Sequence, residues 1–417
     1  MTHPKMQYTY VGIDSHKDTH TAVFIDCFFE KLGELTFDNR PSKFEAFLQS
    51  AQSFLMEGTS FLFGLEDCSQ YGRTLTTFLT KNKCDIRHVN AFMVASERKS
   101  QNVTQKDDSI DAECTARVLL SKFAELPTPS LQDKFWVLRS LVIRRDSLVD
   151  TSKRLKNHLH TLLTQHYPNY RSFFSEIEGD TSLAFFMQYP SPGTLRNTTL
   201  EELTAFLEIP SHGHIGMDRA KMILDTLENT AVEFQEVRDG AVQSAIRQLQ
   251  FNMKEIEQLE ENLEYFLPKL DCTLTSMAEI STVSAAQILS CIGDIRRFST
   301  PAKLARYAGI APVTYASGKT ATQFANKRGN RELNALLFWL AVRVTMVAGR
   351  NRKVMNSFFY EYYHRKISEG KTKRQALKCV QRRLVNIIWT MLTNNEEYVN
   401  PPTFDEPKHE PGHKPEE

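Results

Sequence analysis

The chain has 417 residues, more than a single folding core usually holds, so two or three domains are expected. Hydrophobic residues make up 41% and charged residues 24%, and no run of about 18 apolar residues could span a bilayer. The seven cysteines are scattered without a C-x-x-C pair, which argues against a disulfide framework and a structural zinc site. Without a signal pattern at its start, the chain is expected to be cytoplasmic.

The net charge of +1 conceals a strong asymmetry along the chain. Residues 296–383 contain 20 Lys/Arg and 3 Asp/Glu, whereas residues 218–270 contain 6 basic and 11 acidic residues. A cationic module with so few acids indicates a polyanionic partner. Nucleic acid is favoured over the alternative, a merely solvated basic face.

Strand and helix patterns alternate over residues 6–125, which predicts an α/β domain with a central mixed sheet. The first strand, "VGI", ends in Asp14, and a tight polar turn leads to a second strand, "TAVFI". Further strands are expected at residues 31–37, 60–67 and 84–90, and helices at 41–56, 71–82 and 108–123.

Residues 126–270 begin with a proline-bearing linker and continue as long helical runs. Leucines recur at seven-residue spacing, and a second run covers about 218–266. Two interpretations remain open, an antiparallel or intermolecular coiled coil and an ordinary helical bundle. Either one makes this region a spacer or dimer arm. The spaced leucines are Leu141, Leu148, Leu155 and Leu162.

Residues 271–393 form a mostly α-helical region interrupted by a glycine-rich stretch. Residues 394–417 are rich in proline and charge, so a disordered tail is expected.

Four carboxylates have the pattern of a metal site. Asp14 and Glu66 end predicted strands, and Asp108 and Asp111 lie one turn apart at the start of a helix. Two Mg²⁺ ions about 4 Å apart need such hard oxygen ligands, and they can bind both the attacking and the leaving oxygen of a phosphodiester.

Spacing alone leaves this metal site at even odds. An acidic residue at a helix start is more often a cap. Asp107 shares a face with Asp111 almost as well as Asp108 does, and Asp67 adjoins Glu66.

The stretch 305–330 contains glycines, small polar residues and cations, but no acid. Its glycines allow close backbone approach around a bulky ligand, and its cations can bind phosphate oxygens. Ser317 would lie beside that phosphate, Tyr315 is a competing nucleophile, and the simpler alternative is a turn capped by Ser317. The glycines are Gly309, Gly318 and Gly329, and the candidate nucleic-acid-binding cations are Lys319, Lys327, Arg328 and Arg331.

Six segments resemble, in order, the insertion sequence 110 family of DNA transposases and recombinases, which includes Piv-type DNA invertases. The resemblance spans about residues 8–390, and the ordered set is far more specific than any one segment. The segments are "YVGIDSHKDTHTAV", "GLEDCSQYG", "QKDDSIDAECTARVL", "RRDSLVDTSKRLKNHLHTLL", "IGDIRRFSTPAKLARYAGIAPVTYASGK" and "NKRGNRELNALLFWLA".

This resemblance implies an RNase H-like (RuvC-like) domain with a D-E-D-D tetrad, a coiled-coil insertion and a C-terminal transposase domain with a catalytic serine. The implied tetrad is Asp14, Glu66, Asp108 and Asp111, and the implied nucleophile is Ser317. The segment "KDDSIDA" favours Asp108 over Asp107. One departure is "MAEISTVSAAQIL", which lacks the glycines of a family hairpin and leaves that hairpin's DNA contact open.

The implied activity is strand transfer through a covalent phosphoserine link, with Mg²⁺ activating the serine in a composite site shared between protomers. The implied partners are donor and target DNA, a structured bridging guide RNA, and further copies of the chain in a dimer or tetramer, in the nucleoid of a prokaryote. Two alternatives remain: a RuvC-type endonuclease using metal-activated water or a Piv-type invertase reading DNA directly. The filled tetrad disfavours an inactive nucleic-acid-binding protein.

Overall fold

The computed structural model describes residues 3–66, 70–101, 105, 107–129, 133–227, 233–317, 320–324, 326, 329–349 and 352–400. The side chains of residues 133, 314–317 and 320–323 are outside this description. The chain divides into two compact units. Unit 1 comprises Met1–Trp136 and Asp294–Ser299, and unit 2 comprises Val137–Gly293 and Thr300–Glu417.

A five-stranded mixed sheet with the strand order β3-β2-β1-β4-β5 forms the centre of unit 1. The strand β1 pairs antiparallel with β2 and parallel with β4, while β2 pairs antiparallel with β3 and β4 parallel with β5. The mixed sheet predicted from the sequence is therefore confirmed. Its strands are β1 (Tyr8–Ser15), β2 (Thr19–Ile25), β3 (Lys31–Asp38), β4 (Ser60–Leu65) and β5 (Asp85–His88).

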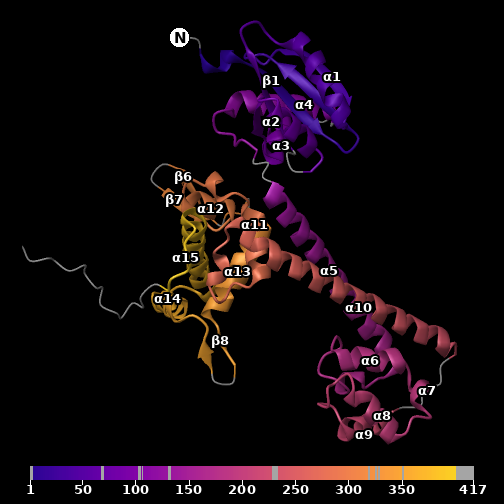
Figure 1. Cartoon of the computed structure of the whole chain (residues 1–417). Helices are drawn as coiled ribbons and strands as arrows, with labels where there is room; N and C mark the ends of the chain where they lie inside the picture. The colour runs from indigo at the N-terminus through magenta and orange to yellow at the C-terminus, as the bar shows by residue number, and fades with distance from the viewer. Residues whose placement is uncertain are drawn as a thin grey trace, which may run out of the picture. The chain divides into compact units, whose positions relative to one another are not determined.

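Alternate side chains of the strands enter two separate cores, one on each face of the sheet. Val11 and Ile13 pack with the helices α1 (Pro41–Ala51) and α2 (Arg73–Lys81). Tyr10 packs on the opposite face with α4 (Asp108–Lys122) and Val94 of α3 (Ala91–Ser100). Figure 1 labels β1 and the helices α1 to α4 of this unit. The helix α3 was not predicted from the sequence. It buries only one residue, Val94.

Gly12 in β1 allows α4 to lie directly against the sheet. A methyl group at this position would overlap the backbone oxygen of Ala112 and the backbone nitrogen of Ala116 in α4. Its register partner in β4 is Gly64, which also faces α4, but there a methyl group would approach only the side chains of Leu119 and Val89, at 3.1 Å. Helix and sheet backbones thus come together most closely at Gly12.

Two long helices, α5 (Asp133–His166) and α10 (Gln235–Phe266), make up much of the first part of unit 2. The chain between them forms a small helical module. The ends of α5 and α10 share one apolar core with the module, and Figure 1 shows α6, α8 and α9 gathered at that end. The module was not predicted from the sequence. Its helices are α6 (Asp180–Gln188), α7 (Pro192–Leu195), α8 (Leu200–Glu208) and α9 (Met217–Asp225).

The four leucines at seven-residue spacing contribute unequally to the buried face of α5. Leu148 is buried, whereas the other three leucines are half-buried. The buried line of α5 also includes Ser152 and His166. The coiled-coil interpretation therefore stays a prediction.

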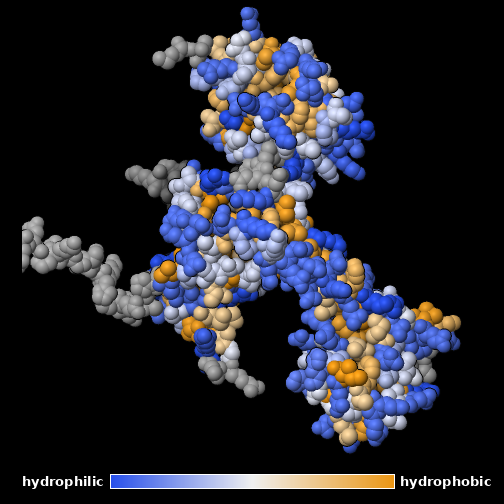
Figure 2. Space-filling view, in the orientation of Figure 1, coloured by the Kyte–Doolittle hydropathy of each residue, from blue (hydrophilic) through white to orange (hydrophobic). Residues whose placement is uncertain are grey.

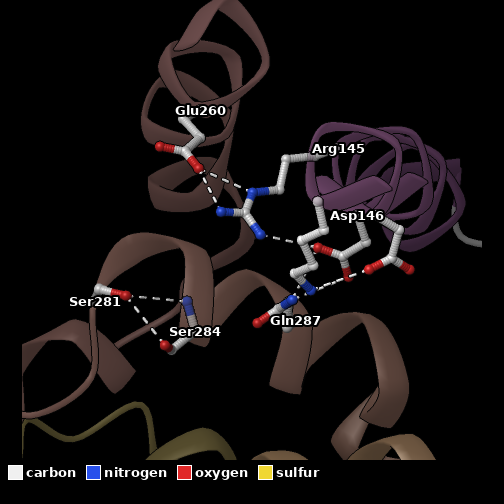
Figure 3. Close-up of polar contacts among 8 residues, drawn as sticks. Arg145, Asp146, Glu260, Ser281, Ser284 and Gln287 are labelled. Carbon is white, nitrogen blue, oxygen red and sulfur yellow. Dashed lines mark hydrogen bonds and ion pairs between the residues drawn. The ribbon is translucent and has the colours of Figure 1, made fainter. Parts of the chain in front are cut away.

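Polar contacts connect α5 to α10 and to α11 (Thr282–Ile292), as Figure 3 shows. Arg145 of α5 donates from Nε and Nη2 to Glu260 Oε1 of α10 at 2.9 and 2.6 Å. Gln287 of α11 donates to both carboxylate oxygens of Asp146, at 3.0 and 2.9 Å. These bonds join neighbouring residues of α5 to two different helices and fix the helices to one another.

The rest of unit 2 is mostly helical, as predicted, and carries two short antiparallel hairpins. The helices are α12 (Pro301–Tyr307), α13 (Arg331–Thr345), α14 (Ser357–Ser368) and α15 (Lys373–Asn394). The hairpins are β6 (Val313–Ser317) with β7 (Thr320–Phe324) and β8 (Val347–Ala348) with β9 (Lys353–Val354).

The segment that lacks the family's hairpin glycines forms a turn followed by α11, whose N-cap is Ser281. Glu279 in that turn is buried and accepts from Asn356 Nδ2 at 3.3 Å. Most of the predicted disordered tail lies outside the described residues. In the part that is described, the Tyr398 amide donates to Ser276 Oγ at 2.8 Å.

The surface and the cysteines agree with the composition. Figure 2 shows hydrophilic side chains over most of the visible surface of both units. Within the described ranges, no helix is both long and apolar enough to cross a membrane. The six cysteines in these ranges are free.

Gly12→Ala is expected to destabilise unit 1 by about 3 kcal/mol or more, because the added methyl meets rigid backbone. Gly64→Ala is the matched control, since its methyl meets side chains that can adjust, and its expected cost is about 1 kcal/mol. Denaturant unfolding monitored by circular dichroism measures both. Equal losses of stability would contradict the close approach at Gly12.

Candidate functional site

Two of the predicted acids lie at the carboxyl edge of the sheet in unit 1. Asp14 is near the end of β1, on the same face as Gly12 and therefore toward α4. Glu66 comes directly after Leu65, which is the register partner of Ile13. Because β1 and β4 are parallel, Asp14 and Glu66 occupy neighbouring positions at this edge.

The start of α4 brings Asp108 to the same edge. Asp107 is the N-cap residue, and its Oδ1 accepts a hydrogen bond from the Ile110 amide at 2.8 Å. Ser109 donates to Glu34 Oε2 of β3 at 2.5 Å, which ties the first turn to the sheet. In this register Asp107 caps the helix and Asp108 points toward the strand end, so the geometry favours Asp108 over Asp107, whose roles stay predictions.

His16, which the sequence analysis missed, bridges two of these carboxylates. Its Nε2 lies 3.0 Å from Asp14 Oδ2 and 3.1 Å from Asp108 Oδ1. One potential ligand atom from each of the three side chains lies within 4.8 Å of the other two. The signal was present in the sequence, because His16 follows Asp14 by two residues and strand alternation places both on one side.

Asp111 has a cationic partner of its own, Arg98 of α3, which forms an ion pair with it. Asp111 is 11% exposed, whereas Asp108 is 54% exposed. A carboxylate this buried needs a compensating charge. Arg98 could not be assigned from the sequence, because the helix that carries it was not predicted.

The acids and His16 perturb one another's protonation. Burial raises the pKa of Asp14, His16 lowers it, and the nearby Asp108 and Asp111 carboxylates raise it further, with a net rise above the ordinary value. Burial alone would lower the pKa of His16, but Asp14 and Asp108 more than offset this and leave it raised. The cluster therefore favours a positive charge among its carboxylates.

The donor set of this cluster fits a divalent cation. Ligand atoms on opposite sides of one Mg²⁺ are about 4.2 Å apart, so small side-chain movements would bring Asp14 and Asp108 onto a shared ion. Their oxygens suit Mg²⁺ or Mn²⁺, whereas an imidazole nitrogen is a poorer ligand for Mg²⁺. A bound ion would thus take the place that His16 now fills between the carboxylates. Asp67 lies outside the described residues.

Ser317 lies in unit 2 as the last residue of β6, and its Cα pairs with Thr320 at the start of β7. The sequence analysis expected a loop here, but a hairpin is present. Gly318 and Lys319, which connect its strands, lie outside the described residues, and so do the side chains of Tyr315 and Ser317. The backbone thus places Ser317 at the tip of the hairpin.

The base of this hairpin is closed by two glycines in direct contact. A methyl group at Gly329 would overlap the backbone of Gly309, whose φ is +67°. Asn334 Nδ2 donates to Ala308 O at 2.7 Å, and the Asn330 amide donates to Tyr307 O at 2.7 Å. The expectation that these glycines bend around a bulky ligand stays a prediction; the structure shows that Gly309 and Gly329 pack backbone against backbone.

The predicted cations are only partly described. Arg331 is the first residue of α13 and is exposed. Lys319, Lys327 and Arg328 lie outside the described residues, so their part in nucleic-acid binding stays a prediction.

Comparison with known families gives two matches. A model of the IS110-type DEDD transposase domain, described as transposase, matches residues 11–168. A second, described as the transposase IS116/IS110/IS902 family, matches residues 272–359. Together they cover more than half of the chain, including the acid cluster and the serine hairpin.

Three relatives are similar over most of the chain. A protein of insertion element IS116 from Streptomyces clavuligerus is 25% identical over 409 residues, 94% of this chain and 96% of the relative. A protein of insertion element IS110 from Streptomyces coelicolor is 27% identical, over 70% of this chain and 72% of its own. The pilin gene-inverting protein of Moraxella lacunata is 21% identical, over 94% of this chain and 98% of its own.

In the metal-free protein, the pKa of His16 is expected above the ordinary value of about 6.5, and Asp14→Asn is expected to lower it. The stabilisation from protonated His16 is then complete below about pH 6.5 and is lost as pH rises through the folded-state pKa. An NMR titration of the His16 ring in EDTA measures this, with Asp85→Asn as a control outside the cluster. An unchanged His16 pKa in Asp14→Asn would contradict the bridge.

Proposed function

Because the chain belongs to the IS110-type transposase family, we propose that it cuts and rejoins the DNA of a mobile element. The proposed nucleophile is Ser317, and the proposed metal ligands are the four acids of unit 1. The observation that carries the metal assignment is the convergence of Asp14 and Asp108 at one edge of the sheet.

The topology of unit 1 supports an RNase H-like assignment for the domain. Its strand order is β3-β2-β1-β4-β5, with three antiparallel strands followed by two parallel ones. The central strand carries Asp14, and the next strand leads into Glu66. The helix packed on the central strand supplies Asp108 and Asp111.

The four acids would hold two Mg²⁺ ions, which would supply charge stabilisation at the phosphate and activation of the serine hydroxyl. Asp108 is exposed enough to turn toward an ion, while Asp111 starts paired with Arg98. Asp14 must be ionised to act as a ligand, and a bound cation would offset the burial that raises its pKa.

Ser317 would attack a DNA phosphorus through its Oγ. A phosphorus–oxygen bond to the serine forms as the bond to one deoxyribose oxygen breaks, and the serine proton is lost while the released sugar oxygen gains one. A sugar hydroxyl of the other DNA partner then attacks the same phosphorus. The new phosphodiester bond forms as the bond to the serine breaks, the sugar hydroxyl loses its proton and the serine oxygen regains one. The covalent link conserves the phosphodiester bond energy for rejoining.

The proposed partners are donor and target DNA, with a structured guide RNA pairing to both. The excess of cations over residues 296–383 supports a polyanionic partner such as nucleic acid. The similarity to a pilin gene-inverting protein favours site-specific inversion as the second candidate function. Both candidates use the same cutting and rejoining chemistry.

Wild-type protein incubated with Mg²⁺, guide RNA and end-labelled DNA is expected to form an adduct that survives denaturation. Ser317→Ala is expected to abolish the adduct, because the covalent link to DNA is the bond between Ser317 Oγ and the phosphorus. Tyr315→Phe is the matched control two residues away and should retain it. Denaturing gel electrophoresis measures all three proteins.

Two results would reverse the serine assignment. An adduct that persists in Ser317→Ala but is lost in Tyr315→Phe identifies the tyrosine instead. Mg²⁺-dependent cleavage by Ser317→Ala without any adduct supports the RuvC-type endonuclease that uses water.

The acids and the serine are proposed to act from different protomers. Asp14→Ala and Ser317→Ala chains, each inactive alone, should then recover strand transfer when mixed. When the two variants assemble, the intact serine of the Asp14→Ala chain and the intact tetrad of the Ser317→Ala chain can form one complete active site. Reaction products quantified across mixing ratios measure this, and no recovery at any ratio contradicts sharing.

A further inference from the structure

A cavity in unit 2 lies between the residues that lead into the serine hairpin and the helix α15. Its volume is about 530 Å³. Ile310 and Pro312 line one side, Tyr362 of α14 contributes an aromatic ring, and Lys378 and Arg382 of α15 line the other side. Pockets of about 300–1,000 Å³ accommodate small organic molecules, so this one is large enough for a nucleotide.

We propose that this cavity binds one unpaired nucleotide of the DNA strand beside the cut, with its phosphate at Lys378 and Arg382 and its base against Tyr362. The inference rests on the proposed function, because the strand is the one that Ser317 attacks. It adds a specific nucleotide-binding site to a unit whose cations otherwise indicate only a polyanionic partner.

The described residues that line the cavity carry an excess of positive charge. Lys371, Lys378 and Arg382 are among them and no acid is, although Glu369 lies close enough for Lys371 to lower its pKa. Lys378 and Arg382 are four residues apart and so lie on the same face of α15. Burial lowers the pKa of Lys378, and the neighbouring Arg374 lowers it further. A phosphate at this position would offset both effects.

The aromatic side of the cavity is held in place by cations. The guanidinium of Arg383 lies 5.2 Å from the centre of the Tyr362 ring, and that of Arg365 lies 5.3 Å from it. Ile310 is only 4% exposed, so the opposite wall is apolar and well packed. The ammonium of Lys366 also lies 5.4 Å from the ring centre, so a base at Tyr362 would contact the ring together with the cations beside it. Aromatic rings and Arg guanidinium groups both hold unpaired bases without reading their sequence.

A second cavity, of about 560 Å³, shares Tyr362, Cys379 and Arg382 with the first. It differs in charge, because Glu396 and Glu397 line it. Those acids disfavour phosphate there. The acid-free cavity is therefore the one that fits a nucleotide, and the strand would approach it from the side of the hairpin.

The distance along the chain favours DNA near the cut as the occupant. Pro312 lines the cavity and directly precedes β6, which ends at Ser317. Five residues of strand span about 16 Å. Stacked nucleotides of one strand rise about 3.4 Å each. A nucleotide in the cavity would thus lie within a few nucleotides of the serine.

The test uses full-length protein carrying Ser317→Ala, so that binding is measured without cutting. Lys378→Glu should weaken binding of a fluorescent single-stranded DNA by about tenfold or more, the scale of one lost nucleotide contact. Lys373→Glu is the matched control, with the same charge change on the same helix but outside the cavity. It should weaken binding by less than about threefold, since exposed charge is screened.

A second variant protects the test against misfolding, because Lys378 is half-buried. Lys378→Met keeps the apolar stem and removes the charge, and it should also reduce binding more than Lys373→Glu does. Single-stranded DNA carrying 5-iododeoxyuridine should crosslink to Tyr362 on irradiation, as located by peptide mass spectrometry. Crosslinks only to residues outside the cavity would overturn the proposal.

The remaining outcomes separate this inference from the proposed function. Equal weakening by Lys378→Glu and Lys373→Glu refutes the nucleotide site, and strand transfer still stands if wild-type protein forms the serine adduct. Lys378-dependent binding without any adduct supports the nucleotide site and refutes the serine chemistry. Lys378-dependent binding of single-stranded RNA but not DNA overturns the assignment of the occupant.

Discussion

The candidate metal site depends on one backbone contact, the approach of α4 to β1 at Gly12. The absence of a side chain there lets Ala112 and Ala116 lie directly on the strand. Asp14 follows Gly12 by two residues on the same face, and Asp108 precedes Ala112 by one helical turn. Any side chain at position 12 would lift the helix and separate the two carboxylates, so stability and acid geometry are set by the same contact.

The same device recurs in unit 2, where Gly309 and Gly329 meet backbone to backbone at the base of the serine hairpin. In both units a glycine removes the volume that would hold two segments apart, and a chemically important residue follows in the chain. Ser317 comes eight residues after Gly309, and Asp14 two residues after Gly12. In both places the glycine sets how closely two backbone segments approach.

The sequence predicted the sheet of unit 1 well, because its strands carry strong local signals such as "TAVFI" and "SFLFGL". It also predicted that Asp14 and Glu66 end strands and that Asp108 lies at the start of a helix. It missed Arg98, because α3 buries a single residue fully and lacks a clear apolar stripe. It missed the β6–β7 hairpin, although Val313, Thr314 and Tyr315 are strand formers, because the stretch was interpreted as a glycine-rich loop. The packing of Gly309 on Gly329 could not be predicted, since it joins residues 20 positions apart through backbone atoms alone.

The two units differ in how their charges are compensated, and this difference separates binding from chemistry. In unit 1 three of the four proposed acids have cationic partners, since His16 contacts Asp14 and Asp108 while Arg98 contacts Asp111. In the acid-free cavity of unit 2, Lys378 is paired with no lining carboxylate. In the proposed function, nucleic acid would gain favourable contacts in unit 2 whether or not a metal is present. The proposed metal ligands of unit 1 would have to exchange their cationic partners for an ion before they contribute, so metal would control cutting while cationic surface would control binding.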